Sequence, residues 1–292
     1  MLDILYIAMS EHSHKTPPPK SPLKDRHCMR LITWNMNSLR LRLPLLQRLA
    51  EEHSPDVICV QETKVPDPLF PKEALAELGF THQLYKGMKS YNGVAILSRL
   101  PLRLREDTPR WCERDDCRHV AAFVETESGP VQIHNFYVPA GGDIPDPDEN
   151  DKFAHKLSFV DEATQWFRQH PPTRSILVGD LNIAPFENDV WSHKQLLKIV
   201  SHTPAETSRL QDWCHAGFQD AMRHQTPEPE KLYTWWSYRN RDWKKSNRGR
   251  RLDHIWLTAD ILPCLQNITV LKEARDWERP SDHVPVMADI LL

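Results

Sequence analysis

The chain has 292 residues, of which 40% are hydrophobic and 26% charged, and its formal net charge is −3. This composition is typical of a soluble globular protein, and no apolar run approaches the roughly 18–20 residues needed to span a bilayer, so we exclude a membrane protein. The length fits one large domain or two small ones, because single cores stop growing near roughly 250–300 residues.

Residues 1–28 are predicted to form a disordered N-terminal extension. Their apolar start, MLDILYIAM, is short, carries Asp3 where a secretion signal has basic residues, and precedes no small-residue cleavage site. The six cysteines form no CxxC pair, and Cys59 and Cys264 stand in the apolar surroundings of buried thiols. We therefore expect no disulfide framework or zinc site, and a cytoplasmic localisation.

The predicted elements of the first half are one helix among several strands. The helix spans 43–53 and is amphipathic, and the strands lie at 30–35, 56–62, 93–98, 120–125 and 131–138. Polar or proline-containing turns separate the last three strands at the spacing of hairpins, so this part of the sheet is expected to be antiparallel.

The second half mixes helices and strands. Residues 151–169 predict a helix, with Phe153, Leu157, Val160 and Trp166 roughly in helical register. The remaining predicted elements are a strand at 175–185 that ends in a polar loop, a helix near 205–216, a loop at 233–238, and strands at 252–258, 268–272 and 284–291. No repeat, low-complexity tract or long linker divides the chain after its extension, so we expect one domain over residues 29–292.

Polar side chains cluster where several of these strands end. They are Asn35, Asn37, Glu62, Tyr137, Asp180, Asn182, Asp253, Asp282 and His283. In folds built on sheets, the strand ends and the loops that follow them are where functional sites are usually built. The pattern therefore predicts a site at these strand ends.

Two of the motifs supply acidic and amide groups. Glu62 follows a buried strand in QETK, and taken alone it is better explained as a strand-end carboxylate in water. In GDLN, Asp180 and Asn182 stand two positions apart and point the same way in an extended segment, although an Asx turn would also explain them.

A third motif, PSDHVPV, places Asp282 and His283 just before the final strand. An Asp-His pair in a loop is often only a surface hydrogen bond. Together, however, the three motifs supply what metal-assisted phosphodiester cleavage requires. Oxygen ligands such as Glu62 suit Mg²⁺, a carboxylate can take a proton from the attacking water, and a histidine can bond the phosphoryl oxygen as its charge builds.

Nucleic acid is the expected partner because of one local run of charge. Residues 239–251 contain seven Lys or Arg and one Asp, which gives +6 in thirteen positions, although a solvated loop would have the same composition. The neighbouring Trp235, Trp236 and Tyr238 offer flat faces to an exposed sugar or base, unless Trp236 and Tyr238 belong to the core.

Seven stretches of the chain resemble, in family order, the exonuclease III family of abasic-site endonucleases within the endonuclease/exonuclease/phosphatase superfamily. They are WNMNSLR (34–40), PDVICVQETK (55–64), NFYVP (135–139), LVGDLNIAP (177–185), YTWWSYR (233–239), NRGRRLDHIWL (247–257) and PSDHVPV (280–286). The resemblance covers nearly all of residues 30–292. It implies an α/β fold, a four-layered α/β sandwich in which two mixed, mostly antiparallel sheets pack face to face and are flanked by helices, as in DNase I.

The resemblance also implies roles for the residues at the strand ends. Those matching catalytic positions are Asn35, Tyr137, Asp180, Asn182, Asp253 and His283. Glu62 matches the main metal ligand, Asn37 and Asp282 match further metal contacts, and we extend the metal site to Asn35, Asp180, Asn182 and His283. The implied cofactor is Mg²⁺ or Mn²⁺. The resemblance leaves open which group is the general base and whether one or two metals act.

For DNA, the implied contacts are Trp235, Arg239, Lys244, Lys245, Arg248, Arg250 and Leu252. In the family, apolar and aromatic groups at the positions of Trp235, Arg250 and Leu252 line the pocket for an abasic sugar, and Arg250 departs from this pattern. Either its guanidinium stacks over the pocket or the lining is made differently. In RGRRLDHIW, alternation along a strand points Asp253 and His254 to opposite faces, and the resemblance selects Asp253 as the partner of His283.

The expected function is therefore that of a metal-dependent DNA repair nuclease of exonuclease III type. It would cut duplex DNA 5′ to abasic sites and remove 3′ nucleotides or 3′ blocking groups, acting as a monomer. One alternative is a phosphodiesterase or phosphatase of the same superfamily that acts on a small molecule or lipid. The other is an inactive DNA-binding module, although every catalytic position is filled by a competent residue.

Overall fold

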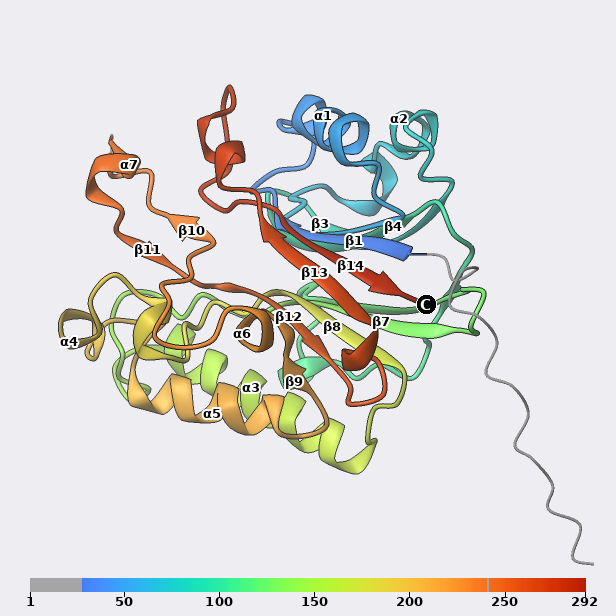
Figure 1. Ribbon diagram of the computed structural model, residues 1–292. Helices are drawn as coiled ribbons and strands as arrows, with labels where there is room; N and C mark the ends of the chain where they lie inside the picture. The colour runs from blue at the N-terminus through green and yellow to red at the C-terminus, as the bar shows by residue number, and fades with distance from the viewer. Residues whose placement is uncertain (1–27, 241) are drawn as a thin grey trace, which may run out of the picture.

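The computed structural model describes residues 28–240 and 242–292. The predicted extension therefore lies outside the described residues, except for Cys28, which begins strand β1. Two six-stranded sheets pack face to face (Figure 1). The first sheet has the order β13 (Leu265–Val270), β14 (Val286–Leu291), β1 (Cys28–Asn35), β2 (Val57–Gln61), β4 (Tyr91–Ser98), β3 (His82–Met88).

The second sheet has the order β5 (Leu102–Leu104), β6 (His119–Val124), β7 (Val131–Tyr137), β8 (Ser175–Asp180), β12 (Asp253–Leu257), β9 (Gln219–Asp220). Within the two sheets β1 and β2 run parallel, as do β7 and β8, whereas the other paired strands are antiparallel. Both sheets are thus mixed and mostly antiparallel.

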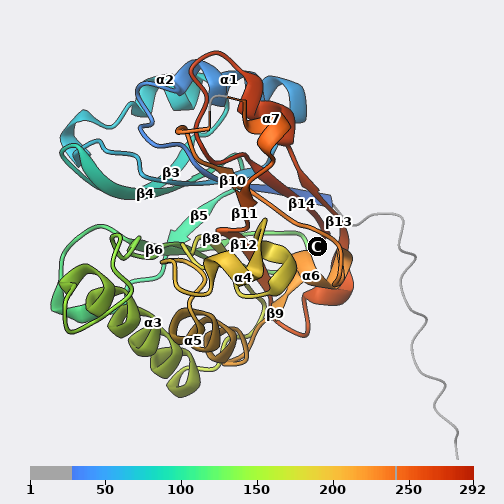
Figure 2. The same ribbon diagram turned by 90° about the vertical axis from the view of Figure 1, so that its left-hand side faces the viewer.

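Helices cover the outer face of each sheet, which completes the four layers (Figures 1 and 2). The first sheet is covered by α1 (Leu43–His53) and α2 (Lys72–Glu77), and the second by α3 (Asp151–Gln169) and α5 (Pro204–Cys214). The shorter elements are α4 (His193–Leu196), α6 (Ala221–Gln225), α7 (Trp243–Ser246) and a ribbon of β10 (Trp235–Trp236) and β11 (Gly249–Arg250). The predicted fold class is confirmed.

The long helices form where the sequence pattern places them. Helix α1 has a proline at the start, where the missing N–H costs nothing, and buries Leu46 and Leu49. Helix α3 begins after Asn150, whose side chain accepts the N–H of Lys152 as an N-cap, and its buried face includes Phe153. Both helices have the bounds predicted for them because apolar period and end signals agree.

Apolar side chains from both sheets fill the space between them, among them Val57, Ile96, Val178 and Ile255. Toward the site, this interface becomes polar. Gln61 on β2 donates to Asn135 Oδ1 on β7 at 2.7 Å, and Asn135 donates back to the carbonyl oxygens of Val60 and Ala95. These buried bonds join the two sheets one residue before Glu62.

Several predicted elements differ from the structure. The sequence pattern missed β3 and β5, because the half-buried or exposed side chains of these edge strands do not alternate clearly. The strands predicted as one antiparallel group are divided: β6 and β7 form a hairpin in the second sheet, but β4 belongs to the first. The strand predicted at 268–272 begins at Leu265.

None of the helices in residues 28–240 and 242–292 is long and apolar enough to cross a membrane.

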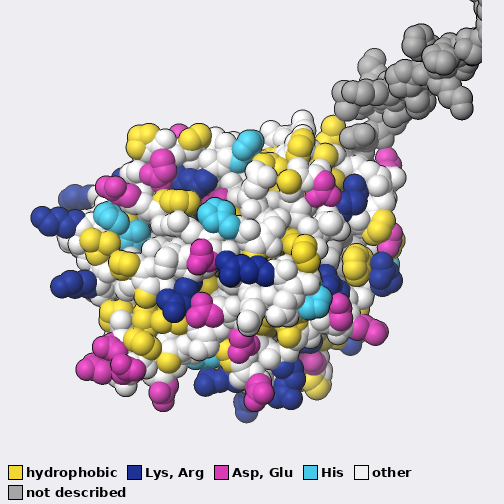
Figure 3. Space-filling model, turned by 90° about the horizontal axis from the view of Figure 1, so that it is seen from below, with side chains coloured by type: hydrophobic (Ala, Val, Ile, Leu, Met, Phe, Trp, Pro, Cys, Tyr) yellow, Lys and Arg dark blue, Asp and Glu magenta, His cyan; other side chains and the backbone are white. Residues whose placement is uncertain are grey.

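The outer surface of the layer formed by α3 and α5 carries Lys and Arg side chains interspersed with Asp and Glu (Figure 3). Such mixing of charges is typical of a solvated helical surface and offers no continuous cationic track to a polyanion. The basic run lies elsewhere, around β10, α7 and β11.

Candidate active site

Three strands of the second sheet place predicted site residues side by side. Tyr137 on β7 pairs with Asp180 on β8, and Asp180 pairs in turn with Asp253 on β12. Residues directly opposite in neighbouring strands project from the same face of a sheet. Asp180 therefore lies between Tyr137 and Asp253, on the same face of the second sheet and at one end of the sandwich.

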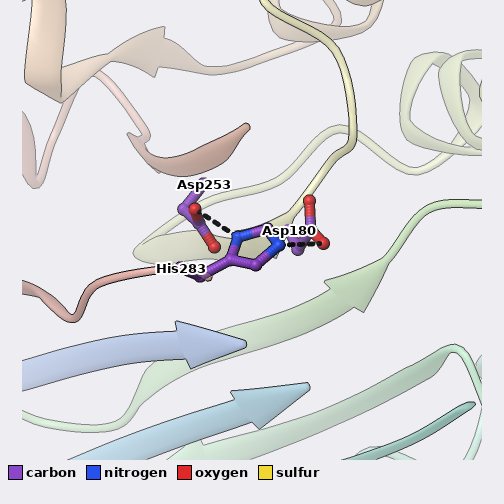
Figure 4. A group of neighbouring side chains, drawn as sticks. All are labelled: Asp180, Asp253 and His283. Carbon is purple, nitrogen blue, oxygen red and sulfur yellow. Dashed lines mark hydrogen bonds and ion pairs between the residues drawn. The ribbon is translucent and has the colours of Figure 1, made fainter. Parts of the chain in front are cut away.

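His283 comes from the loop before β14 and lies between two carboxylates (Figure 4). Its Nδ1 is 2.9 Å from Asp253 Oδ2, and its Nε2 is 3.6 Å from Asp180 Oδ2. The loop is fixed by Trp34 Nε1, which donates to the His283 carbonyl, and by Ser281 Oγ, which accepts the His283 N–H. The bond to Asp253 thus turns Nε2 of the imidazole toward Asp180.

Burial and charge set the protonation of this group. Burial disfavours a charged imidazole, but the carboxylates of Asp253 and Asp180 outweigh it and raise the pKa of His283 to about 10. Burial also raises the pKa of Asp180 to about 7, against the lowering effect of the His283 cation. An imidazolium N–H donor therefore lies beside a carboxylate that can accept a proton near neutral pH.

Glu62 connects the two sheets at this end of the sandwich. Its Oε1 accepts hydrogen bonds from Asn35 Nδ2 at 2.9 Å and from the Tyr137 hydroxyl at 2.8 Å. Asn35 Nδ2 also donates to Asp180 Oδ2 at 2.8 Å. Burial favours protonation of Glu62, but the hydrogen bonds from Asn35 and Lys64 and the nearby positive charges hold the pKa of Glu62 below its ordinary value.

The residues around Glu62 fit a hard cation. Glu62 Oε2 lies 2.8 Å from Lys64 Nζ, which donates to Asn37 Oδ1 at 2.6 Å, and Asn37 Nδ2 lies 3.4 Å from Asp282 Oδ1. Carboxylate and amide oxygens are the ligands that Mg²⁺ prefers. The ammonium group of Lys64 shows that these oxygens already hold a positive charge.

A second acidic group is a weaker candidate for a metal. Ligand atoms of Asp180, Asp253 and His283 lie within 4.8 Å of one another. His283, however, uses Nδ1 to bond Asp253 and is favoured as the imidazolium, which has no lone pair for a metal. This geometry favours His283 as a donor to an anion.

Strained backbone supports the same residues. Asn37, Glu62, Lys64 and Asn182 have φ between 47° and 55°, in the left-handed region that few residues other than glycine adopt. Such strain persists where the surrounding structure enforces it, often at functional sites. Beside Asp180, a Cβ on Gly179 would lie 1.9 Å from the Phe136 carbonyl oxygen, so the approach of β7 to β8 requires glycine.

A cavity of about 660 Å³ opens beside His283 and extends along the β10–β11 ribbon. Its lining includes five of the predicted DNA contacts, namely Trp235, Arg239, Arg248, Arg250 and Leu252. The Arg250 guanidinium lies 5.4 Å from the centre of the Trp235 ring, and the Arg248 guanidinium lies 4.6 Å from that of Trp191. Arg250 thus stacks over the pocket, which is the first of the two possibilities raised by the sequence.

The other residues of the basic run have different surroundings. Lys244 and Lys245 are exposed on α7 and do not line the cavity, and Lys244 pairs with Asp276 at 2.7 Å. Arg251 is fully buried and bonds both carboxylate oxygens of Asp189, so it is part of the scaffold. The run is therefore not one continuous surface.

Three residues next to the predicted site residues, Trp236, Tyr238 and His254, have structural surroundings. Trp236 is buried in the core, whereas Tyr238 is exposed and its hydroxyl donates to the Pro280 carbonyl. His254 faces away from the site and bonds the Ile183 carbonyl at 2.9 Å. The prediction that Asp253 and His254 point to opposite faces of β12 is therefore confirmed.

Sequence reasoning gave no role to Lys64 or Arg118. Lys64 follows Glu62 by two positions in QETK, and this spacing is a signal that could have been used. Arg118 lies 5.0 Å from the centre of the Tyr137 ring and donates to the Tyr137 carbonyl, but its partner is 19 residues away and no local motif links them.

Comparisons with known proteins agree with this geometry. Residues 32–283 match the Endonuclease/Exonuclease/phosphatase family. The chain is 32% identical to exodeoxyribonuclease III of Haemophilus influenzae over 270 residues, which cover 89% of this chain and 99% of that protein.

Two solved structures are similar over 90% of this chain, each with a TM-score of 0.82. One is a 3′ phosphatase from Neisseria bound to a product DNA hairpin, 32% identical, of which 99% is covered. The other is an AP endonuclease from Archaeoglobus fulgidus, 28% identical and covered in full. The resemblance seen in the sequence is confirmed, and the chain belongs to the Endonuclease/Exonuclease/phosphatase family.

Proposed function

We propose that this chain is a metal-dependent DNA repair nuclease of exonuclease III type, which hydrolyses phosphodiester bonds 5′ to abasic sites and removes 3′ nucleotides or 3′ blocking groups. The observation that carries the proposal is the juxtaposition of two features. Glu62 and His283, the latter held between Asp253 and Asp180, line the same cavity as arginine and tryptophan side chains. The similar exodeoxyribonuclease, 3′ phosphatase and AP endonuclease support it.

In this proposal Asp180 orients the attacking water and takes its proton. Its two oxygens are held by the N–H of Asn182 at 2.9 Å and by Asn35 Nδ2, so the carboxylate cannot rotate away. His283 donates Nε2–H to a phosphoryl oxygen as negative charge builds there, and Asp253 fixes the ring through Nδ1. Tyr137 contributes its hydroxyl beside the phosphate.

Glu62, with Asn37 and Asp282, would hold Mg²⁺ or Mn²⁺, and Asn35, Asp180 and Asn182 complete the proposed metal surroundings, whereas His283, first expected among them, instead serves as the donor to the phosphate. A bound divalent cation supplies charge neutralisation at the phosphate and the leaving oxygen. Lys64 would have to release Glu62 Oε2 when the cation binds, because the ammonium group now pairs with that oxygen.

The proposal extends to the organisation of the protein. We assign residues 29–292 to one catalytic domain, and the enzyme to the cytoplasm, which its six free cysteines support. We further propose that it acts on duplex DNA as a monomer. Trp235, Arg239, Lys244, Lys245, Arg248, Arg250 and Leu252 are the proposed DNA contacts.

A Mg²⁺ titration of nicking on a duplex with one abasic site tests the function. We expect incision that requires the cation, with Mn²⁺ compared in parallel. Binding without incision would favour an inactive DNA-binding module. Neither binding nor incision would favour a superfamily enzyme that acts on a small phosphoester. Matched abasic, nicked and 3′-phosphate duplexes then rank the three activities.

A further inference from the structure

Among the three arginines that line the cavity, Arg250 is distinguished by a buried donor atom without a hydrogen-bond partner. Among the described residues no Asp or Glu oxygen lies within ion-pair distance of its guanidinium, whereas the adjacent Arg251 pairs with Asp189 and Asp220. Arg250 Nη1 donates only to neutral acceptors, the Val200 carbonyl at 3.0 Å and Ser201 Oγ at 2.7 Å. Its Nε is buried and has no hydrogen-bond partner.

A partly buried guanidinium whose N–H group makes no hydrogen bond destabilises the folded protein, unless a ligand supplies the missing acceptor. The guanidinium carbon also lies over the Trp235 ring, 5.4 Å from its centre, and this ring is fixed by its Nε1–H bond to Asp282 at 2.9 Å. The indole and the guanidinium therefore form one preorganised wall of the cavity. Arg248 over Trp191 repeats the arrangement nearby.

The chemistry of this wall indicates what it contacts. A nucleobase offers a π face for stacking on indole and guanidinium, and ring or carbonyl acceptors for Arg250 Nη2, which is not buried and donates to no atom of the described residues. An abasic deoxyribose has no π face and no such acceptors on the base side, so it would leave the donor of Arg250 unpaired. The cavity of about 660 Å³ falls in the range that accepts a whole small ligand.

We propose that Arg250 and Trp235 form a subsite for the base of the nucleotide next to the scissile phosphate, so that the enzyme prefers 3′-terminal nucleotides that retain their base over abasic ones. This inference rests on the proposed nuclease function. Arg250 is thus a specificity-determining residue.

Three duplexes with the same sequence and different 3′ ends test the subsite. One ends in a normal nucleotide, the second in a tetrahydrofuran nucleotide that lacks the base, and the third in a 3′-phosphate. The measured quantity is kcat/KM for wild type, Arg250→Leu and Arg250→Lys. Arg209→Leu is a matched control, because Arg209 pairs with Asp161 on the outer helical layer and its loss also removes one positive charge.

Wild type should remove the normal nucleotide faster than the tetrahydrofuran nucleotide. Arg250→Leu should lower kcat/KM for the normal nucleotide about tenfold, or about 1.4 kcal/mol, and abolish that preference. It should lower kcat/KM for 3′-phosphate hydrolysis by a clearly smaller factor than for the normal nucleotide, because a terminal phosphate leaves the subsite empty. Arg250→Lys, which keeps the charge but loses the plane, should also lose most of the preference. Arg209→Leu should behave as wild type.

The proposal is overturned if Arg250→Leu, with a thermal unfolding midpoint like that of wild type, loses activity equally on all three ends. Should Arg250→Leu be unstable, unchanged preference in a folded Arg250→Lys variant overturns it as well. If wild type hydrolyses none of the three ends, the nuclease function itself fails and the subsite with it. If Arg250→Leu loses the preference for the normal nucleotide and keeps 3′-phosphate hydrolysis, the result supports the subsite.

Discussion

At the scale of single residues, the two carboxylates that flank His283 have different surroundings. Both are buried, but Asp253 bonds Nδ1, whereas Asp180 faces the other ring nitrogen and accepts from the Asn182 backbone N–H and the Asn35 side-chain amide. A carboxylate that orients an imidazole and one that accepts a proton need these two environments. The positions on β12 and β8 thus separate a supporting role from a reacting one.

Asp180→Asn is expected to lower the single-turnover rate of abasic-site incision by about 10²–10⁴-fold, because the amide cannot take a proton from water. DNA affinity should change little, since the arginine and tryptophan wall is untouched. Quench-flow kinetics and fluorescence anisotropy measure the two quantities separately. Equal loss of rate and affinity would contradict the proposed role of Asp180.

His254 provides a prediction for stability against pH. Burial, together with the charge of Arg251, lowers the pKa of His254 to about 3, and its ordinary value is about 6.5. Between these values the unfolded chain binds the proton and the folded chain does not, so stability falls as the pH falls. His254 should account for about 1.4 kcal/mol of lost stability per pH unit in this window.

Urea unfolding of wild type and His254→Gln at several pH values between 7 and 5 measures this effect. His119 and His134, whose pKa values are also lowered by burial, keep their contributions in the variant. The slope of unfolding free energy against pH should therefore be smaller in His254→Gln but not zero. Identical slopes would rule out a neutral, buried His254.

Much of the site could be predicted from the sequence because its residues stand in short motifs. Glu62, Asp180 and His283 each follow or precede an apolar strand, and this pattern locates them without knowledge of the fold. The role of Lys64 and the partners of Arg250 could not be predicted. They depend on contacts with Glu62, Val200 and Ser201 that only tertiary structure creates.

At the scale of elements, a buried ion pair joins the two outer helices to the site. Lys156 on α3 pairs with Glu206 on α5, and both side chains are fully buried. Lys156 Nζ also donates to the Asn182 carbonyl at 2.9 Å, and Glu206 accepts the N–H of Ser201. The ion pair thus fixes Asn182 in the loop after β8, and it fixes Ser201, whose hydroxyl accepts a hydrogen bond from Arg250.

Lys156→Met should destabilise the protein by about 3–5 kcal/mol, because it leaves the Glu206 carboxylate buried without its cation. The double variant Lys156→Met with Glu206→Gln should recover part of this loss, since no uncompensated charge remains. Urea unfolding of the two single variants and the double variant gives the coupling energy. Additive losses would show that the two residues act independently.

The basic run should not behave as one element in DNA binding. Arg248 lines the cavity, whereas Lys244 and Lys245 lie on α7 outside it. Replacing all three by Ala should weaken binding and flatten its dependence on salt, since each phosphate contact releases counterions. Affinity measured between about 50 and 200 mM salt tests this expectation. An unchanged slope would show that the run is only solvated.

The double variant of Lys244 and Lys245 alone separates α7 from the cavity wall. It should reduce the salt slope by less than the triple variant does, because Lys244 already pairs with Asp276.

Long elements with a strong apolar period were predictable, and short ones were not. Helix α3 has the predicted bounds because its N-cap and apolar face agree. The pairing of β12 with β8, which sets Asp253 beside Asp180, joins residues 73 positions apart. No local pattern specifies such a register, because it depends on how the two halves of the chain fold together.

At the scale of the whole molecule, the proposed metal site is also a junction between the sheets. Glu62 follows β2 of the first sheet, whereas Tyr137 and Asp180 are the last residues of β7 and β8 in the second. Asn35 donates hydrogen bonds to the carboxylates of both Glu62 and Asp180. A cation held by Glu62 in the folded chain alone would stabilise the whole sandwich. The gain is RT ln(1 + [M]/Kd), or about 2.7 kcal/mol at a hundredfold excess over Kd.

Thermal unfolding measured over a range of Mg²⁺ concentrations, without DNA, tests this linkage independently of activity. The unfolding midpoint of wild type should rise with the logarithm of Mg²⁺ concentration, whereas that of Glu62→Gln should stay nearly constant because the amide is a weaker ligand. Asp161→Asn is a control, since this half-exposed carboxylate lies on the outer helical layer. Its midpoint should follow wild type. If Glu62→Gln responds to Mg²⁺ as wild type does, the cation binds elsewhere and the assignment of Glu62 as the main ligand is wrong.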